Sequence, residues 1–193
     1  MKKIIAMLLA LTMLVAFAGC NNTTAPETTE DTKTPETTEA AVVNLTGTLE
    51  ELLGKVIEKE SVEFMGGAMA LDLTDKSEDG LWMVKNYTGL DNADSIDEAA
   101  FYEPMMGSIP YSMVMVRVNE GVEVKTVAEG MKNGIDQRKW ICVEADDLQV
   151  VSFGDVVMLI MVGSDTGMTS QAFVDAFAAV CAEQVANAEL TVY

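Results

Sequence analysis

The sequence changes character near residue 43, and this change limits what the chain can fold into. Residues 4–18 carry no charge, and residues 21–41 contain eight Thr, five acidic residues, two Pro and no aromatic residue. A Thr/Glu/Pro-rich stretch of this kind cannot bury enough apolar surface to offset the entropy of ordering it. The sequence therefore predicts a disordered segment over 20–43 and a globular domain over 44–193, which is long enough for one core.

The N-terminus has the pattern of a secretory signal. Lys2 and Lys3 precede the apolar run at residues 4–18, which as a helix would span roughly 22 Å, short of a hydrocarbon core of about 30 Å. A buried core helix is the alternative interpretation, but the run is apolar on every side and leads into the Thr-rich segment. We therefore expect residues 1–19 to be a signal peptide.

The four residues at 17–20 read FAGC and resemble the lipobox of bacterial lipoproteins. Ala18 and Gly19 match that pattern, while Phe17 departs from the usual Leu. The resemblance implies that a lipid is added to the Cys20 thiol and that the signal is cut just before it. A diacylated Cys20 would supply the two chains that stable anchoring needs. The expected location is thus the extracytoplasmic face of a cell membrane, with residues 20–43 as a tether.

Periodicity over 44–193 predicts an α+β fold of one domain. A capping box at Thr48 and Glu51 predicts a helix that follows at once. Both faces of residues 111–119 are largely apolar, which indicates a central, covered strand. The class we expect is a mainly antiparallel sheet with three to four helices packed on one side. The expected helices are 49–59, 124–135 and one from Thr169 or Ser170 to about Asn187, and the expected strands are 68–73, 111–119 and a hairpin turning near Gly154 and Asp155.

Four segments of the domain are similar to an uncharacterised domain of Gram-positive bacterial lipoproteins. They read EPMMGS at 103–108, YSMVMVRV at 111–118, RKWICVEADD at 138–147 and GDVVMLIM at 154–161. The lipobox and the Thr-rich tether fit the same family. This resemblance implies a location and a shared fold, and it assigns no activity and no catalytic or binding residue.

Charge and histidine content exclude several function classes. The chain has 12 basic and 31 acidic residues, and its net charge of −19 disfavours nucleic acid as a partner. It contains no His, so Ser-His-Asp and Cys-His mechanisms and His-zinc sites are excluded.

Two cysteines fall in the domain. Cys142 and Cys181 form no CxxC motif, which argues against redox or zinc-knuckle chemistry. A disulfide is possible in an oxidising exterior. We favour two separate buried thiols, with Cys181 on the apolar stripe of the last helix.

Two acidic segments have some features of a binding or catalytic site. Asp75, Ser77 and Asp79 alternate as in a calcium loop, but the twelfth position is Asn86 instead of Glu, so we predict a solvated acidic turn. The carboxylates at 144, 146 and 147 could act in glycoside hydrolysis if two of them faced each other across a cleft. Local pairing with Arg138 or Lys139 in a solvated turn is the favoured prediction.

The 14 methionines permit two interpretations. A Met-rich surface can bind apolar partners or ligate Cu(I). Because most of the methionines alternate with Val, Leu and Ile, we predict that they fill the core, and we expect only Met105 and Met106 to be exposed.

These patterns favour a non-enzymatic binding or envelope-accessory module anchored through Cys20, with no catalytic or metal site and no cofactor. Its protein or small-molecule partner is not specified by the sequence. The alternatives are a small solute-binding lipoprotein of a transporter and, with less support, a carboxylate-based wall hydrolase.

Overall fold

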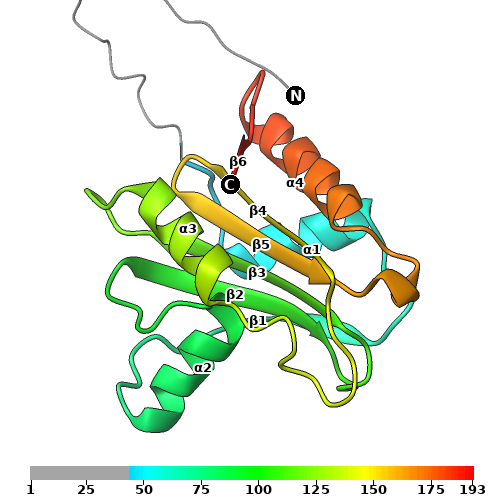
Figure 1. The fold of residues 1–193 in the computed structure, drawn as a ribbon. Helices are drawn as coiled ribbons and strands as arrows, with labels where there is room; N and C mark the ends of the chain where they lie inside the picture. Colours follow the sequence, from blue (N-terminus) through cyan, green and yellow to red (C-terminus); the bar gives the residue numbers. More distant parts are fainter. Residues whose placement is uncertain (1–43) are drawn as a thin grey trace, which may run out of the picture. The chain divides into compact units, whose positions relative to one another are not determined.

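Two apolar strands, β3 (Tyr111–Val118) and β5 (Val156–Val162), pair at the centre of a six-stranded antiparallel sheet (Figure 1). The computed structural model describes residues 44–193, so the predicted signal 1–19, Cys20 and the predicted tether lie outside the described residues. The strand order is β1-β2-β3-β5-β4-β6. The outer strands are β1 (Gly66–Ala70), β2 (Ile96–Pro104), β4 (Asp147–Phe153) and β6 (Thr191–Val192).

Four helices cover the sheet, two on each face (Figure 1). On one face α1 (Leu49–Lys59) and α4 (Ser170–Gln184) pack against Met113 and Met115. On the other face α2 (Glu78–Thr88) and α3 (Val124–Gly134) pack against Val114 and Val116. The α+β class is confirmed, but the expectation that the helices lie on one side is wrong. Successive side chains of a strand point to opposite faces, so a strand that is apolar at every position needs cover on both.

Most of the expected elements are present. The helix expected over 49–59 has the same bounds in the structure, and both halves of its Thr48–Glu51 capping box form. The last helix begins at Ser170 with Thr169 as its cap and ends at Gln184, a few residues before Asn187. The β4–β5 hairpin is confirmed, and the strand expected over 68–73 lies at 66–70.

Four elements, namely α2, β2, β6 and the 3-10 turn η1 (Ser164–Thr166), were not predicted from the sequence. The acidic segment at 75–80 begins α2, since the Ser77 side chain caps its N-terminus and Gly89 ends it with a left-handed φ of 81°. Its apolar pattern is weak: Trp82 is 61% exposed, and the buried positions are Gly80, Val84 and Thr88. The caps were therefore the better sequence signal for this helix.

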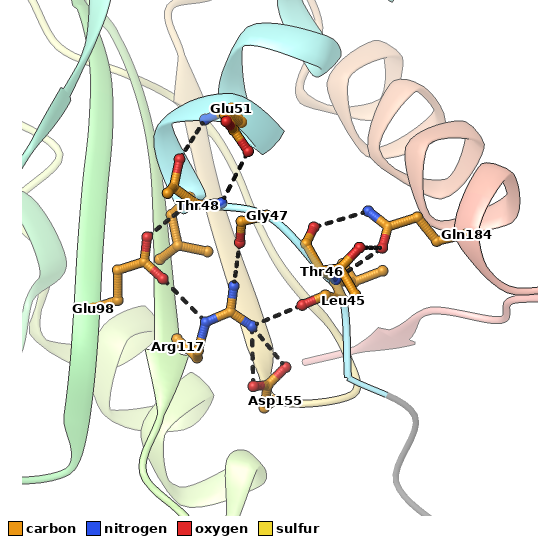
Figure 2. A network of polar contacts seen from close by, with 10 residues as sticks. Leu45, Thr46, Gly47, Thr48, Glu51, Glu98, Arg117, Asp155 and Gln184 are labelled. Carbon is orange, nitrogen blue, oxygen red and sulfur yellow. Dashed lines mark hydrogen bonds and ion pairs between the residues drawn. The ribbon is translucent and has the colours of Figure 1, made fainter.

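Arg117 fixes the start of the described chain to one end of the sheet (Figure 2). Its guanidinium donates to the Leu45 carbonyl at 3.1 Å and to the Gly47 carbonyl at 2.9 Å. It also pairs with Glu98 and Asp155, each at 3.0 Å. Burial lowers the Arg117 pKa, but the hydrogen bonds to these two carboxylates outweigh burial and raise it overall. The segment that precedes α1 is thus held at the β4–β5 turn.

No helix among residues 44–193 is both long enough and apolar enough to cross a membrane.

Candidate functional site: an acidic cavity at one end of the sheet

A cavity of about 640 Å³ lies at the end of the sheet where β1 and β3 begin and β5 ends. This volume is in the range of small-molecule sites. The cavity walls come from the segment after α1, the β2–β3 turn and the segment from the 3-10 turn to α4. Its carboxylates are Glu60, Glu63 and Asp165, its apolar residues are Phe64, Ile109, Pro110, Met168 and Ala172, and its hydroxyl residues are Ser61, Ser108, Thr166 and Thr169.

Backbone hydrogen bonds hold two of these walls together. The Gly163 N–H donates to the Pro110 carbonyl at 2.8 Å, and Thr166 folds back so that its N–H reaches the Gly163 carbonyl at 3.0 Å. The Thr166 hydroxyl oxygen then accepts from the Met168 N–H at 3.2 Å. These bonds place Asp165 and Met168 at the cavity without a long flexible loop.

Among the described residues, Phe64 is the one aromatic residue that lines the cavity, and core rings behind it hold it in place. Phe64 packs edge-on to Tyr111 with ring centroids 5.0 Å apart, and Tyr111 packs edge-on to Phe173 at 5.1 Å. Burial raises the pKa of Tyr111 well above its usual value, so its hydroxyl stays neutral at physiological pH. Such ring pairs add rigidity as well as buried area.

The cavity lining contains three carboxylates and no basic side chain. Lys59 lies near this end of α1, but its ammonium is paired with Glu183 on α4. Carboxylates beside a low-dielectric apolar wall concentrate negative potential. The lining therefore suits a ligand that carries both a positive charge and an apolar part.

The carboxylates at 144, 146 and 147 are separated by their partners and do not face one another. Glu144 pairs with Arg138, as predicted. Asp146 accepts from the backbone and hydroxyl of Ser164, both at 2.7 Å, and the hydroxyl bond is the main cause of its lowered pKa. Asp147 accepts from the Ser170 N–H at 2.8 Å. Asp146 and Asp147 thus brace the segment between β5 and α4, next to the cavity.

The segment at 75–80 serves as the start of α2. Asp75 accepts from the Ser77 N–H at 2.9 Å, and the Ser77 hydroxyl accepts from the Gly80 N–H at 3.2 Å. Hydrogen bonding from Ser77 lowers the pKa of Asp75. Among residues 44–193 no group of three His, Cys, Asp or Glu side chains is placed to hold a metal ion.

The two thiols of the domain are free, and one is buried while the other is exposed. Cys181 lies in the core of α4, and burial raises its pKa to about 12. Cys142 is exposed, so the expectation that it is buried is wrong. It lies in the irregular segment before β4 with a φ of 63°, next to Ile141, which is 84% exposed.

The prediction for the methionines is confirmed for the central strands and for Met105 and Met106, but not for two others. Those in the central strands are buried, and Met105 and Met106 are 78% and 62% exposed. Two further methionines on the β1 side, Met65 and Met69, are also exposed, at 79% and 50%. Neither exposure was predicted, because the sequence did not show that the strand expected over 68–73 is an edge of the sheet.

One buried polar cluster, around Lys139, was not predicted from the sequence. The Lys139 ammonium lies 3.2 Å from the Ser112 hydroxyl, pairs with Glu103 and sits 4.9 Å from the Tyr87 ring centroid. Burial lowers its pKa. A Ser–Lys pair is a known nucleophile–base arrangement, but Ser112 is fully buried and neither residue lines the cavity. The cluster therefore fixes the segment before β4 to the sheet.

No family model, curated protein or solved structure matches this chain. The resemblance to a lipoprotein domain family therefore stays a prediction from the sequence, and the class defined by the fold is a single antiparallel α+β domain with an acidic, apolar-based cavity.

Proposed function

We propose that this chain is a lipoprotein anchored through Cys20 on the extracytoplasmic face of a membrane, and that its domain is a non-enzymatic binding module. The observation that carries the proposal is the composition of the cavity: three carboxylates, an aromatic and aliphatic base, and no basic side chain in its lining. The ligand class that this lining fits is an organic cation with an apolar part, either free or as a side chain of a partner protein.

The position of the cavity supports an outward-facing role. Arg117, which is paired with Asp155, holds residues 45–47 near the start of β5, while Asp165 follows the end of that strand. Seven strand residues separate the two places, which is a distance of roughly 20 Å. A chain anchored through a segment before residue 44 would carry the cavity at the opposite end of the sheet from its attachment.

A second candidate is a small solute-binding lipoprotein of a transporter. The cavity volume favours it, since about 640 Å³ is large enough to hold a small solute. Receptors of that class close two lobes around a cleft, whereas residues 44–193 belong to one compact unit. We therefore rank it second.

Calorimetry with matched ligands tests the binding role. 4-Phenylbutylammonium should bind the full-length chain, and 4-phenylbutanol, which lacks the charge, should bind much more weakly. Asp165→Asn should weaken binding of the cation, because one of the three lining carboxylates is lost. Glu129→Gln removes the same amount of negative charge from an exposed position on α3, away from the cavity lining, and should leave binding unchanged. Equal binding of both ligands, or equal loss in both variants, would contradict the proposal.

A further inference from the structure

Strand β1 is an edge of the sheet with one side free. It pairs only with β2, and none of the other strands among residues 44–193 lies along its outer side. The Leu71 N–H donates to Ala99 at 2.8 Å, and the Met105 N–H donates to Met65 at 2.9 Å. In an antiparallel pair of strands, opposite residues alternate between hydrogen-bonded and non-hydrogen-bonded pairs. The backbone N–H and C=O groups of Met65, Gly67, Met69 and Leu71 therefore point towards β2. The N–H and C=O groups of Gly66, Ala68 and Ala70 consequently point away from the sheet.

This edge lacks the usual protection against pairing. Residues 64–71 contain no charge and no Pro, and β1 shows no bulge in its register with β2. Natural edge strands are normally blocked by Lys, Pro, bulges or a covering segment. Met69 and Ala70 are exposed beside the open row of backbone groups. The edge is therefore available to an added strand.

The two ends of β1 are acidic. Glu60 and Glu63 precede it, and Asp72 and Asp75 follow it, with Lys76 as the one basic residue within 60–76. The Thr74 hydroxyl hydrogen bond is the main cause of the lowered pKa of Asp72, so this carboxylate is charged at neutral pH. An uncharged strand between two acidic ends fits an extended segment that carries basic side chains at its own ends.

We propose that β1 binds an extended, basic-ended segment of a partner protein, which adds to the sheet as a seventh strand. A second copy of this chain fits less well. Antiparallel pairing of two β1 strands about Ala68 would set Phe64 opposite Asp72 and so bring Glu63 of one copy next to Asp72 of the other, and like charges across strands are destabilising. Residues 21–41 of the chain itself carry five acidic residues and one Lys, so they meet the same repulsion.

A peptide titration with full-length protein in mild detergent tests this proposal. The probe is a labelled peptide of sequence Lys-Thr-Val-Thr-Val-Thr-Lys, and its matched control has Glu in place of both Lys residues. Ala70→Pro removes one outward N–H, and Pro is tolerated on the open side of an edge strand. Ala70→Thr keeps the N–H at the same exposed position. Fluorescence anisotropy gives the Kd for each pair.

We expect the basic peptide to bind, the acidic peptide to fail, and Ala70→Pro to weaken binding by about tenfold, as for one lost hydrogen bond with its partner left unpaired. Ala70→Thr should bind like the wild type. Backbone amide NMR shifts on adding the peptide should concentrate at Gly66, Ala68 and Ala70, a readout that does not depend on either variant. The proposal would be overturned if the two peptides bound equally or if the Pro and Thr variants had the same Kd. It would also be overturned by amide shifts elsewhere, or by a wild-type dimer that Ala70→Pro abolishes. The cavity variant Asp165→Asn leaves β1 unchanged, so failure here is distinct from failure of the cavity.

Discussion

The Gly163 N–H donates to the Pro110 carbonyl oxygen at 2.8 Å, and this bond joins the end of β5 to the turn before β3. The contact leaves no room for a side chain. A Cβ on residue 163 would lie 2.4 Å from the Pro110 ring and 2.8 Å from an Asp165 carboxylate oxygen. Pro110 and Asp165 both line the cavity, so the absence of a side chain at Gly163 sets the distance between two cavity walls.

Gly163→Ala should lower the free energy of unfolding by about 1–3 kcal/mol, which is the usual cost of overpacking. It should also weaken binding of 4-phenylbutylammonium, because Pro110 and Asp165 must shift. Gly67→Ala is the matched control, since a Cβ there meets nothing within 4 Å. Chemical denaturation measures both variants. Equal stability of the two would show that the Gly163 contact does not matter.

Arg117→Ala should destabilise the domain by about 3 kcal/mol or more, because the Glu98 and Asp155 carboxylates would lose their cationic partner in a partly buried site. The carbonyls of Leu45 and Gly47 would lose their donor as well. Hydrogen exchange at residues 45–48 should therefore speed up more than in the helices.

Arg138→Ala provides the comparison for Arg117. Arg138 also pairs with a carboxylate, Glu144, but its side chain is 77% exposed. Exposed ion pairs contribute little, so its free energy of unfolding should stay close to that of the wild type. A loss as large as that of Arg117→Ala would contradict the importance assigned to burial.

The stability of the domain should fall as pH rises from 9 towards 12, in part through Cys181. Its pKa is raised from 9.0 to about 12 in the folded state, because the core disfavours a thiolate. Above pH 9 the unfolded chain releases this proton while the folded chain keeps it, so unfolding becomes easier by about 1.4 kcal/mol per pH unit.

The change in slope between the wild type and Cys181→Ala isolates this effect. Tyr111 also has a raised pKa, but it is present in both proteins and cancels in the difference. Cys142→Ser should keep the wild-type slope, since Cys142 is exposed. Parallel pH profiles for the wild type and Cys181→Ala would contradict the burial of this thiol.

The parts of the fold that the sequence predicted are those where one local signal decided the outcome. The Thr48–Glu51 box and the apolar face behind it were sufficient for α1. The unbroken apolar run of β5 was sufficient for a central strand. In β2, by contrast, the acidic residues Asp97 and Glu98 interrupt the apolar pattern. Glu98 pairs with Arg117 on the neighbouring strand β3, and the local sequence gives no sign of this contact.

The cavity could not be predicted, because its walls come from residues near 60, 109 and 166, which are far apart in the sequence and are close only in the folded sheet. No local pattern links Gly163 to Pro110 or Lys139 to Ser112. The exposure of Met105 and Met106 could be predicted, because Pro104 and Gly107 bound them in a turn. The acidic segment at 144–147 was the more conspicuous sequence feature, yet its carboxylates are engaged in local hydrogen bonds.

Membrane anchoring through Cys20 is the central claim, and membrane fractionation of Cys20→Ser tests it most directly. The wild-type chain should sediment with membranes, and its mature form should begin at residue 20 with the mass of added acyl chains. Cys20→Ser should be released from the membrane or keep residues 1–19, whereas Cys142→Ser should behave as the wild type. A Cys20→Ser protein that stays membrane-bound with its signal removed would contradict the account.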